Sequence, residues 1–224
     1  MMNKRFVKGL IAAGLIAAGF GAQAHQAGDI IVRAGAVMVA PNESSPNIVI
    51  PTAKGASTTI NLGEFKVDNN TQLGLNFGYM VTDNFGVELL AATPFSHDVS
   101  LGPLGKIAET KHLPPTLVAQ YYFGNAQSKV RPYVGAGINF TNFFDNKFTN
   151  TAGGRLSDLS MSNSLGFAAQ VGLDVQLNKK WLVNASIWYA DISTDVKFKL
   201  DGAAVKVKTD IDPMVYMVSV GYKF

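Results

Sequence analysis

Apolar and polar side chains alternate with a period of two residues along most of the chain. In the clearest segment, 71–81, Leu73 and Leu75 fall on one face while Gly74 and Asn76 fall on the other. This is the period of a β-strand, whose successive side chains point to opposite faces of a sheet. Along the whole sequence the alternation predicts eight strands, at roughly 29–40, 71–82, 85–95, 116–124, 131–143, 161–177, 181–198 and 205–224.

The connections between these strands are of two kinds that alternate along the chain. Short turns lie at 83–84, 124–130 and 178–180. Long polar or proline-rich loops, which suit solvent better than a hydrogen-bonded ladder, lie near 41–70, 96–115, 144–160 and 199–204. An even number of strands with this pattern of connections is typical of outer-membrane barrels. We therefore predict an all-β fold, an eight-stranded antiparallel transmembrane β-barrel with long extracellular loops and short periplasmic turns.

A lipocalin-like barrel or a sandwich is the soluble alternative, and its apolar face would point inward. Two features favour the membrane barrel. Phe85 and Phe95 stand ten residues apart, which corresponds to about 25 Å of height in a tilted strand, the height of an apolar membrane band. Aromatic residues also cluster beside the short turns, where a membrane interface would fall, at Tyr79, Phe85, Tyr121, Phe123, Trp181, Tyr222 and Phe224.

The first residues have the features of a secretory signal. Lys4, Arg5 and Lys8 precede an apolar run at 9–21, and Ala22-Gln23-Ala24 matches the small-x-small pattern of a cleavage site. The run is shorter than the roughly 20 residues that a membrane-spanning helix needs. The chain is therefore predicted to divide into a signal peptide at 1–24 and an outer-membrane β-barrel at 25–224.

Composition and charge exclude several classes of protein. The chain is 47% hydrophobic and only 16% charged, which argues against disorder, and it has no cysteine, which excludes disulfides and thiolate sites. The net charge of +3 comes entirely from the signal segment, so the remainder has equal numbers of basic and acidic residues. This balance gives no support to nucleic-acid binding.

Seven short motifs along the chain are specific when taken together. They are NNTQLGL (69–75), TDN (82–84), GVELLAATPF (86–95), HLPPTL (112–117), RPYVGAG (131–137), LSDLS (156–160) and GYKF (221–224). These motifs resemble those of the OmpW family of outer-membrane proteins. The similarity covers nearly the whole chain from His25. It implies an eight-stranded barrel with both termini in the periplasm and a narrow, largely hydrophobic channel for uptake of small apolar molecules. The AlkL-like alkane-uptake relatives imply the same class of substrate.

The inward-facing residues fall into two predicted zones. Near the short turns we expect a polar plug, in which Arg33 and Arg131 pair with Glu88 and Asp174, because charges in a narrow interior need partners. Above it we expect an apolar lumen, interrupted by Gln72 and Gln170, with Val37, Val39, Leu90, Val118, Trp188 and Met217. These side chains could simply fill a small barrel; the family resemblance favours a passage instead.

Enzymatic and metal-binding functions have weak support. Ser96-His97-Asp98 places a hydroxyl, an imidazole and a carboxylate side by side, but adjacent residues of an extended chain point apart, whereas a catalytic triad is assembled in space. A metal site from His97, His112, Asp98 and Glu109 lacks any recurring ligand spacing. We expect no catalytic activity, no cofactor and no metal.

The sequence thus predicts an outer-membrane channel for uptake of small hydrophobic molecules, which would leave sideways into the membrane because the plug blocks the way down. Expected partners are outer-membrane lipid, small hydrophobic solutes and the barrel-assembly machinery, for which Tyr222 and Phe224 resemble the C-terminal assembly signal. Two alternatives remain open: a structural or adhesive barrel whose loops bind phage, bacteriocin or host ligands without transport, and a lipid A-modifying enzyme.

Overall fold

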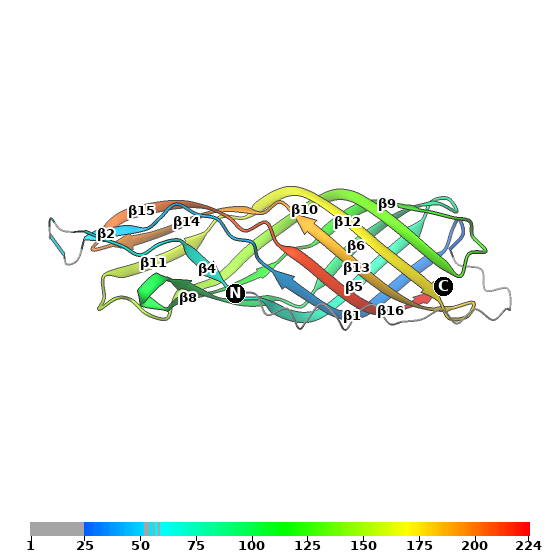
Figure 1. The fold of residues 1–224 in the computed structure, drawn as a ribbon, viewed down its shortest axis with the longest axis horizontal. Coiled ribbons are helices and arrows are strands. Elements are labelled where there is room, and N and C mark those ends of the chain that lie inside the picture. Colours follow the sequence, from blue (N-terminus) through cyan, green and yellow to red (C-terminus); the bar gives the residue numbers. More distant parts are fainter. Residues whose placement is uncertain (1–24, 52–53, 56, 58) are drawn as a thin grey trace, which may run out of the picture.

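The computed structural model describes residues 25–51, 54–55, 57 and 59–224. The predicted signal peptide at 1–24 lies outside the described residues. Within the described residues, eight long strands form a barrel, which fills one half of the elongated molecule in Figure 1. They are β1 (Ile30–Ala40), β5 (Asn70–Met80), β6 (Phe85–Ala92), β9 (Thr116–Tyr122), β10 (Val130–Phe148), β12 (Ser164–Gln176), β13 (Trp181–Ala190) and β16 (Met214–Lys223).

The barrel is closed and antiparallel throughout. Its strands are hydrogen-bonded in the order β1-β5-β6-β9-β10-β12-β13-β16, and β16 pairs back onto β1 from Ile31↔Lys223 to Ala40↔Met214. The first and last strands of the chain are therefore neighbours. Closure matters because it leaves no edge strand with unpaired backbone groups. The prediction of an eight-stranded antiparallel barrel is confirmed.

The alternation read from the sequence separates the two faces of the barrel wall. On β5, Leu73 and Phe77 are 54% and 48% exposed, whereas Asn76 between them is fully buried. The outer surface is apolar and the interior holds polar and charged groups, among them Arg33 and Glu88. A soluble barrel has the opposite arrangement, so the wall is built to face lipid.

Aromatic side chains form a girdle around the short-turn end. Phe85 and Tyr121 meet edge to face with ring centroids 5.0 Å apart, and Tyr121 meets Phe123 in the same way at 5.1 Å. Trp181, Tyr222 and Phe224 form a second edge-to-face run around β13 and β16. Rings with an apolar body and a polar edge are enriched at membrane interfaces, and the predicted cluster beside the short turns is confirmed.

The outward position of Leu75, halfway along β5, leads to a depth-dependent prediction. Leu75→Arg should destabilise the barrel in a lipid bilayer by about 2–4 kcal/mol, because it places a cation near the midplane. Thr71→Arg is the matched control, since Thr71 faces outward on the same strand but near its end; there the cost should be about 0–1 kcal/mol. Equal urea-unfolding free energies for the two variants would refute the assigned depth.

The long connections build a second structure beyond the barrel, which we call the extension; it occupies the left half of Figure 1. In the described residues it consists of a short 3-10 helix, η1 (Gly102–Leu104), and the strands β2 (Val49–Pro51), β3 (Thr59–Asn61), β4 (Phe65–Val67), β7 (Phe95–Leu101), β8 (Lys106–Leu113), β11 (Leu156–Met161), β14 (Ser193–Leu200) and β15 (Ala203–Asp210). No helix among the described residues is long and apolar enough to cross a membrane.

The expectation of long irregular loops is therefore wrong for much of this region. Apolar residues scattered through the loops, including Ile50, Phe65, Ile107 and Phe198, come together as a buried cluster. The strands that carry them are as short as three residues, too short for a period of two to be recognised. Their pairing is decided by contacts between different loops, such as β4 with β7.

Several predicted strands also run through the junction between barrel and extension, where the structure breaks them. The segment 181–198 divides into β13 and β14, and 205–224 divides into β15 and β16 around Asp212, which has φ 35°, and Pro213. Phe95 does not face lipid: β6 ends at Ala92, and Phe95 begins β7 with only 1% of its surface exposed. The height argument from Phe85 and Phe95 was therefore wrong.

Candidate functional site

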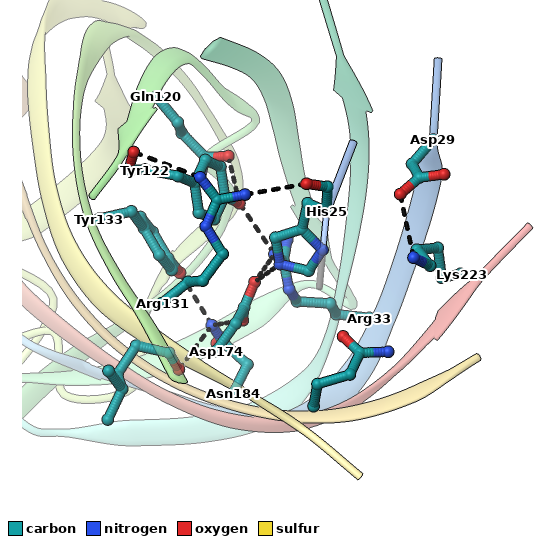
Figure 2. A network of polar contacts seen from close by, with 12 residues as sticks. His25, Asp29, Arg33, Gln120, Tyr122, Arg131, Tyr133, Asp174, Asn184 and Lys223 are labelled. Atoms are coloured by element: carbon teal, nitrogen blue, oxygen red, sulfur yellow. Dashed lines mark hydrogen bonds and ion pairs between the residues drawn. The ribbon is translucent and has the colours of Figure 1, made fainter. Parts of the chain in front are cut away.

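The four residues of the polar plug are buried inside the barrel near the short-turn end. Figure 2 shows three of them, Arg33, Arg131 and Asp174, close together. The four residues come from β1, β6, β10 and β12, so each is placed by a different part of the wall. All four are 2% exposed or less. With two arginines and two carboxylates, the plug has balanced formal charge, which limits the free energy lost on removing charges from water.

Arg33 is the centre of the plug. Its Nη1 binds Glu88, its Nη2 binds Asp174, and Nη2 also donates to the Tyr122 hydroxyl at 2.9 Å. The partners of Arg33 thus come from three other strands. A guanidinium is suited to this position because its rigid fork offers several donors at once.

Arg131 behaves differently from the prediction. Its Nη1 donates to the backbone carbonyl of His25 at 2.9 Å, and its guanidinium lies over the Tyr122 ring at 5.3 Å. No ion pair to Glu88 or Asp174 is found for it within the described part of the chain. The predicted pairing of Arg131 was wrong, because Arg33 already binds both carboxylates and backbone carbonyls take up the second cation.

Amide side chains satisfy the remaining oxygens of the two carboxylates. Gln170 donates to Glu88 Oε1 at 2.9 Å, and Asn184 donates to Asp174 Oδ1 at 2.7 Å. His25 Nε2 lies 2.6 Å from Asp174 Oδ2. Gln170 was expected in the apolar zone, but its bond to Glu88 places it with the plug. Breaking into such a network leaves buried charge without a partner, so removing one of its members should be strongly destabilising.

The six residues of the apolar lumen lie above the plug in one buried cluster. Phe95, Ala168 and Val215 complete this cluster. Val118 and Met217 belong to the cluster but do not line the inner cavity described next, so their side chains fill part of the space beside it. Above them remains an inner cavity of about 30 Å³, lined by Val37, Val39, Leu90, Trp188 and residues at the barrel mouth.

A second, outer cavity of about 70 Å³ lies within the extension. Its walls are almost entirely apolar and come from β2, β4, β7, β8, β10, β11, β14 and β15. The two cavities are adjacent, because they share the lining residues Val39, His112, Ile192 and Pro213. The two apolar cavities therefore lie next to each other where the extension meets the barrel.

Comparisons with known proteins identify this arrangement. The OmpW family model matches residues 26–224, and outer membrane protein W of Escherichia coli (strain K12) is 54% identical over 205 residues, 90% of this chain and 91% of that protein. The chain belongs to the OmpW family. The crystal structure of the outer membrane protein OprG from Pseudomonas aeruginosa is also similar, with a TM-score of 0.80 at 42% identity, covering 90% of this chain and 98% of OprG.

This OmpW-family chain is also similar to the outer membrane protein AlkL of Ectopseudomonas oleovorans. The two are 28% identical over 165 residues, 72% of this chain and 69% of AlkL. A solid-state NMR structure of AlkL in lipid bilayers matches with a TM-score of 0.65 at 25% identity, covering 100% of this chain and 97% of AlkL. These relatives are outer-membrane proteins. The predicted family, fold and outer-membrane location are confirmed.

Sequence reasoning missed three members of the plug network in this OmpW-family barrel. Tyr133 accepts from Asn184 at 2.9 Å, Tyr122 binds Arg33, and His25 binds Asp174. The two tyrosines could have been found, because Tyr133 lies two residues after Arg131 and Tyr122 lies two after Gln120 on the inward faces. His25 could not, because it precedes the first strand and has no alternation to follow.

The histidines of the extension form a buried pair between the two cavities. His97 and His112 meet edge to edge, with ring centroids 5.0 Å apart and 18° between the ring planes, and the centroid of Phe95 lies 5.3 Å from that of His112. His97 binds the Asp68 carbonyl and His112, and not Ser96 or Asp98. Asp98 and Glu109 instead bind Lys106. Among the described residues, no cluster of three or more His, Cys, Asp or Glu side chains could hold a metal ion.

This pair should make the extension sensitive to acid. Burial lowers the pKa of His97, and burial together with the charge of protonated His97 lowers the pKa of His112 to about 3. The folded state favours the neutral rings, whereas the unfolded state protonates them below about pH 6.5. The free energy of unfolding is therefore highest above about pH 6.5 and falls as the pH is lowered toward 3. It should fall by about 1.4 kcal/mol per pH unit for each histidine that remains neutral in the folded state. Urea unfolding from pH 7.5 to 4.5 measures it, and an unchanged slope in His112→Phe would contradict the assignment.

Proposed function

We propose that this barrel is a narrow channel through which small hydrophobic molecules are taken up into the outer membrane. The observation that carries the proposal is the pair of adjacent apolar cavities above a buried polar plug in which Arg33 binds both Glu88 and Asp174. An apolar molecule gains free energy on leaving water for such cavities, whereas a hydrated ion loses its solvation there. The uptake role implied by the resemblance to AlkL-like relatives agrees with this chemistry.

The exit is proposed to lie sideways, through the wall at β6 and β9. Among the eight barrel strands of the described chain these are the shortest, with 8 and 7 residues, and the adjoining Pro94, Pro114 and Pro115 have no N–H for a ladder. Ala92 at the end of β6 and Pro114 before β9 both line the inner cavity. A molecule that reaches this point has lipid beside it and the plug below.

Two measurements test the proposal together. Uptake of a labelled alkane should rise when the barrel is expressed in cells, and the same barrel in a planar bilayer should show little ion conductance. Uptake that does not depend on the barrel would contradict the proposal. It would favour the alternative of a structural or adhesive barrel, in which the extension binds an external ligand. The proposed role is non-catalytic, with no cofactor and no nucleic-acid partner.

The proposed interaction with the barrel-assembly machinery involves the C-terminus. Phe224 is 70% exposed and meets Tyr222 edge to face at 4.7 Å, both on the lipid-facing side of the last strand. Deleting Phe224 should reduce the amount of heat-modifiable barrel in the outer membrane several-fold while leaving signal cleavage unchanged. Deleting Lys223 alone is the matched control, because it shortens the chain by the same one residue but keeps a phenylalanine at the C-terminus. Wild-type levels after loss of Phe224 would contradict an assembly signal.

A further inference from the structure

Lysines gather on one side of the short-turn end. Lys129 ends the connection between β9 and β10, Lys179 and Lys180 lie in the turn between β12 and β13, and all three are exposed. Because β10, β12 and β13 are neighbours in the barrel, the two connections are adjacent, and the Lys129 carbonyl accepts from the Gln176 N–H at 2.8 Å. We call these three residues the lysine sector.

The acidic groups of this end lie elsewhere, are already paired, or are too few to balance the lysine sector. Asp29 binds Lys223 at 3.2 Å. Asp83 lies in the β5–β6 turn, and two strands separate this turn from the β12–β13 turn on either side of the ring, so the two turns are on opposite sides of the barrel. The C-terminal carboxylate of Phe224, on neighbouring β16, adds one negative charge. The lysine sector therefore keeps a net positive charge.

Aromatic side chains supply the lipid-facing side of the same sector. Lys180 Nζ lies 5.4 Å from the centroid of the Tyr222 ring, and Trp181 meets this ring edge to face at 4.9 Å. Trp181 is 46% exposed on the outer wall. Neither Lys179 nor Lys180 forms an ion pair with an acidic side chain of the described chain. Ammonium, indole N–H and phenol O–H groups are all donors that a phosphate oxygen can accept.

We propose that the lysine sector binds the phosphate of an anionic phospholipid in the inner leaflet of the outer membrane. Outer-membrane barrels have their short turns on the periplasmic side, and the aromatic girdle marks the height of the lipid headgroups at this end. Lysines beside a membrane surface attract anionic lipid. Phosphatidylglycerol fits the site better than phosphatidylcholine, because its headgroup lacks the ammonium group that the lysines would repel. This inference concerns the outer wall and does not depend on the proposed passage.

Trp181 makes a local measurement possible. The chain has two tryptophans, and the other one, Trp188, is 2% exposed inside the barrel. In a Trp188→Phe background, Trp181 fluorescence is recorded for the full barrel in phosphatidylcholine vesicles. Part of the lipid is replaced by phosphatidylglycerol with brominated acyl chains or, in parallel, by brominated phosphatidylcholine. Bromine quenches tryptophan only at short range, so the quenching at equal lipid fractions gives the relative affinity of the two lipids beside Trp181.

We expect phosphatidylglycerol to bind beside Trp181 at least about fivefold more strongly than phosphatidylcholine at low salt, the effect of about one lysine at an anionic surface. Lys179→Gln together with Lys180→Gln should bring the two lipids to within about twofold, and high salt should weaken the preference in the same direction. Lys197→Gln together with Lys199→Gln, the same changes at exposed residues of the extension, should leave it at the value of the Trp188→Phe background.

A tryptophan on the opposite side of the barrel tests whether the preference belongs to the lysine sector. Phe85 is 54% exposed, belongs to the same girdle, and follows the β5–β6 turn, which contains Asp83 and no lysine. Phe85→Trp, combined with Trp181→Phe and Trp188→Phe, should report no preference for phosphatidylglycerol. Equal affinities of the two lipids beside Trp181 would overturn the proposal. A preference of the same size at both positions, or one that survives the loss of both lysines, would also overturn it.

Discussion

Arg33→Met should lower the free energy of unfolding of the barrel by about 3–5 kcal/mol, the loss expected when one partner of a buried ion pair is removed. Glu88 and Asp174 would both remain buried without the guanidinium that binds them. Methionine approximates the volume of the arginine stem, so the loss reports charge and hydrogen bonding more than an empty space. Urea unfolding in lipid vesicles at neutral pH measures the change.

Lys111→Met is the control for Arg33→Met, because it also replaces a basic residue with methionine but does so at an exposed ion pair. Lys111 binds Asp145 at 3.0 Å, with the two side chains 46% and 61% exposed, and exposed pairs contribute about 0–1 kcal/mol. Adding Glu88→Gln and Asp174→Asn to Arg33→Met should recover much of the lost stability. Neutralising Glu88 alone would leave Asp174 dependent on His25 and Asn184. A similar loss at Lys111 and Arg33 would contradict the role of burial.

Leu90→Asp should abolish most uptake of apolar solutes. Leu90 is 6% exposed, lines the inner cavity, and lies two residues beyond Glu88 on the inward face of β6. An aspartate there places a carboxylate in an apolar passage, where an unpaired charge is unfavourable by several kcal/mol. The passage should then hold water or a counter-ion in place of an apolar molecule. Initial rates of labelled-alkane uptake, normalised to the amount of folded barrel, measure the effect.

Leu90→Asn separates charge from shape, because its side chain matches aspartate in size and is neutral. We expect an intermediate loss of uptake for Leu90→Asn and the full loss for Leu90→Asp. Planar-bilayer conductance should remain low in both, since the plug beneath is unchanged. Uptake at the wild-type rate in Leu90→Asp would mean that apolar solutes do not pass this point.

The sequence predicted the barrel wall well because the relevant signal is local. Alternation needs only the neighbouring residues, and it correctly placed Arg33, Glu88 and Asp174 inside and Leu75 outside. Which charges meet is not a local property. Arg33 and Asp174 are 141 residues apart in the chain, and their contact depends on the height at which each strand joins its neighbours. The alternation of inward and outward positions alone could not show that Arg33 would bind both carboxylates.

The extension was beyond sequence reasoning for a different reason. His97 and His112 were noticed, but the bond between their Nε2 atoms follows from the pairing of β7 with β8, in which Phe95 lies opposite His112. Nor could composition predict that apolar residues scattered among polar loop residues would surround a cavity. The inward positions of the candidate site therefore follow from local alternation, whereas its contacts and cavities depend on how distant strands pair.

The pairing of β1 with β16 also determines when this protein can insert. The partner of the first strand is the last one to be synthesised, so a chain that lacks its final residues has two open edges, on β1 and on β13. In a bilayer each backbone group along those edges would be unfavourable by several kcal/mol. A barrel that lacks β16 is therefore unstable in the bilayer, and stable insertion needs the first and the last strand of the chain together.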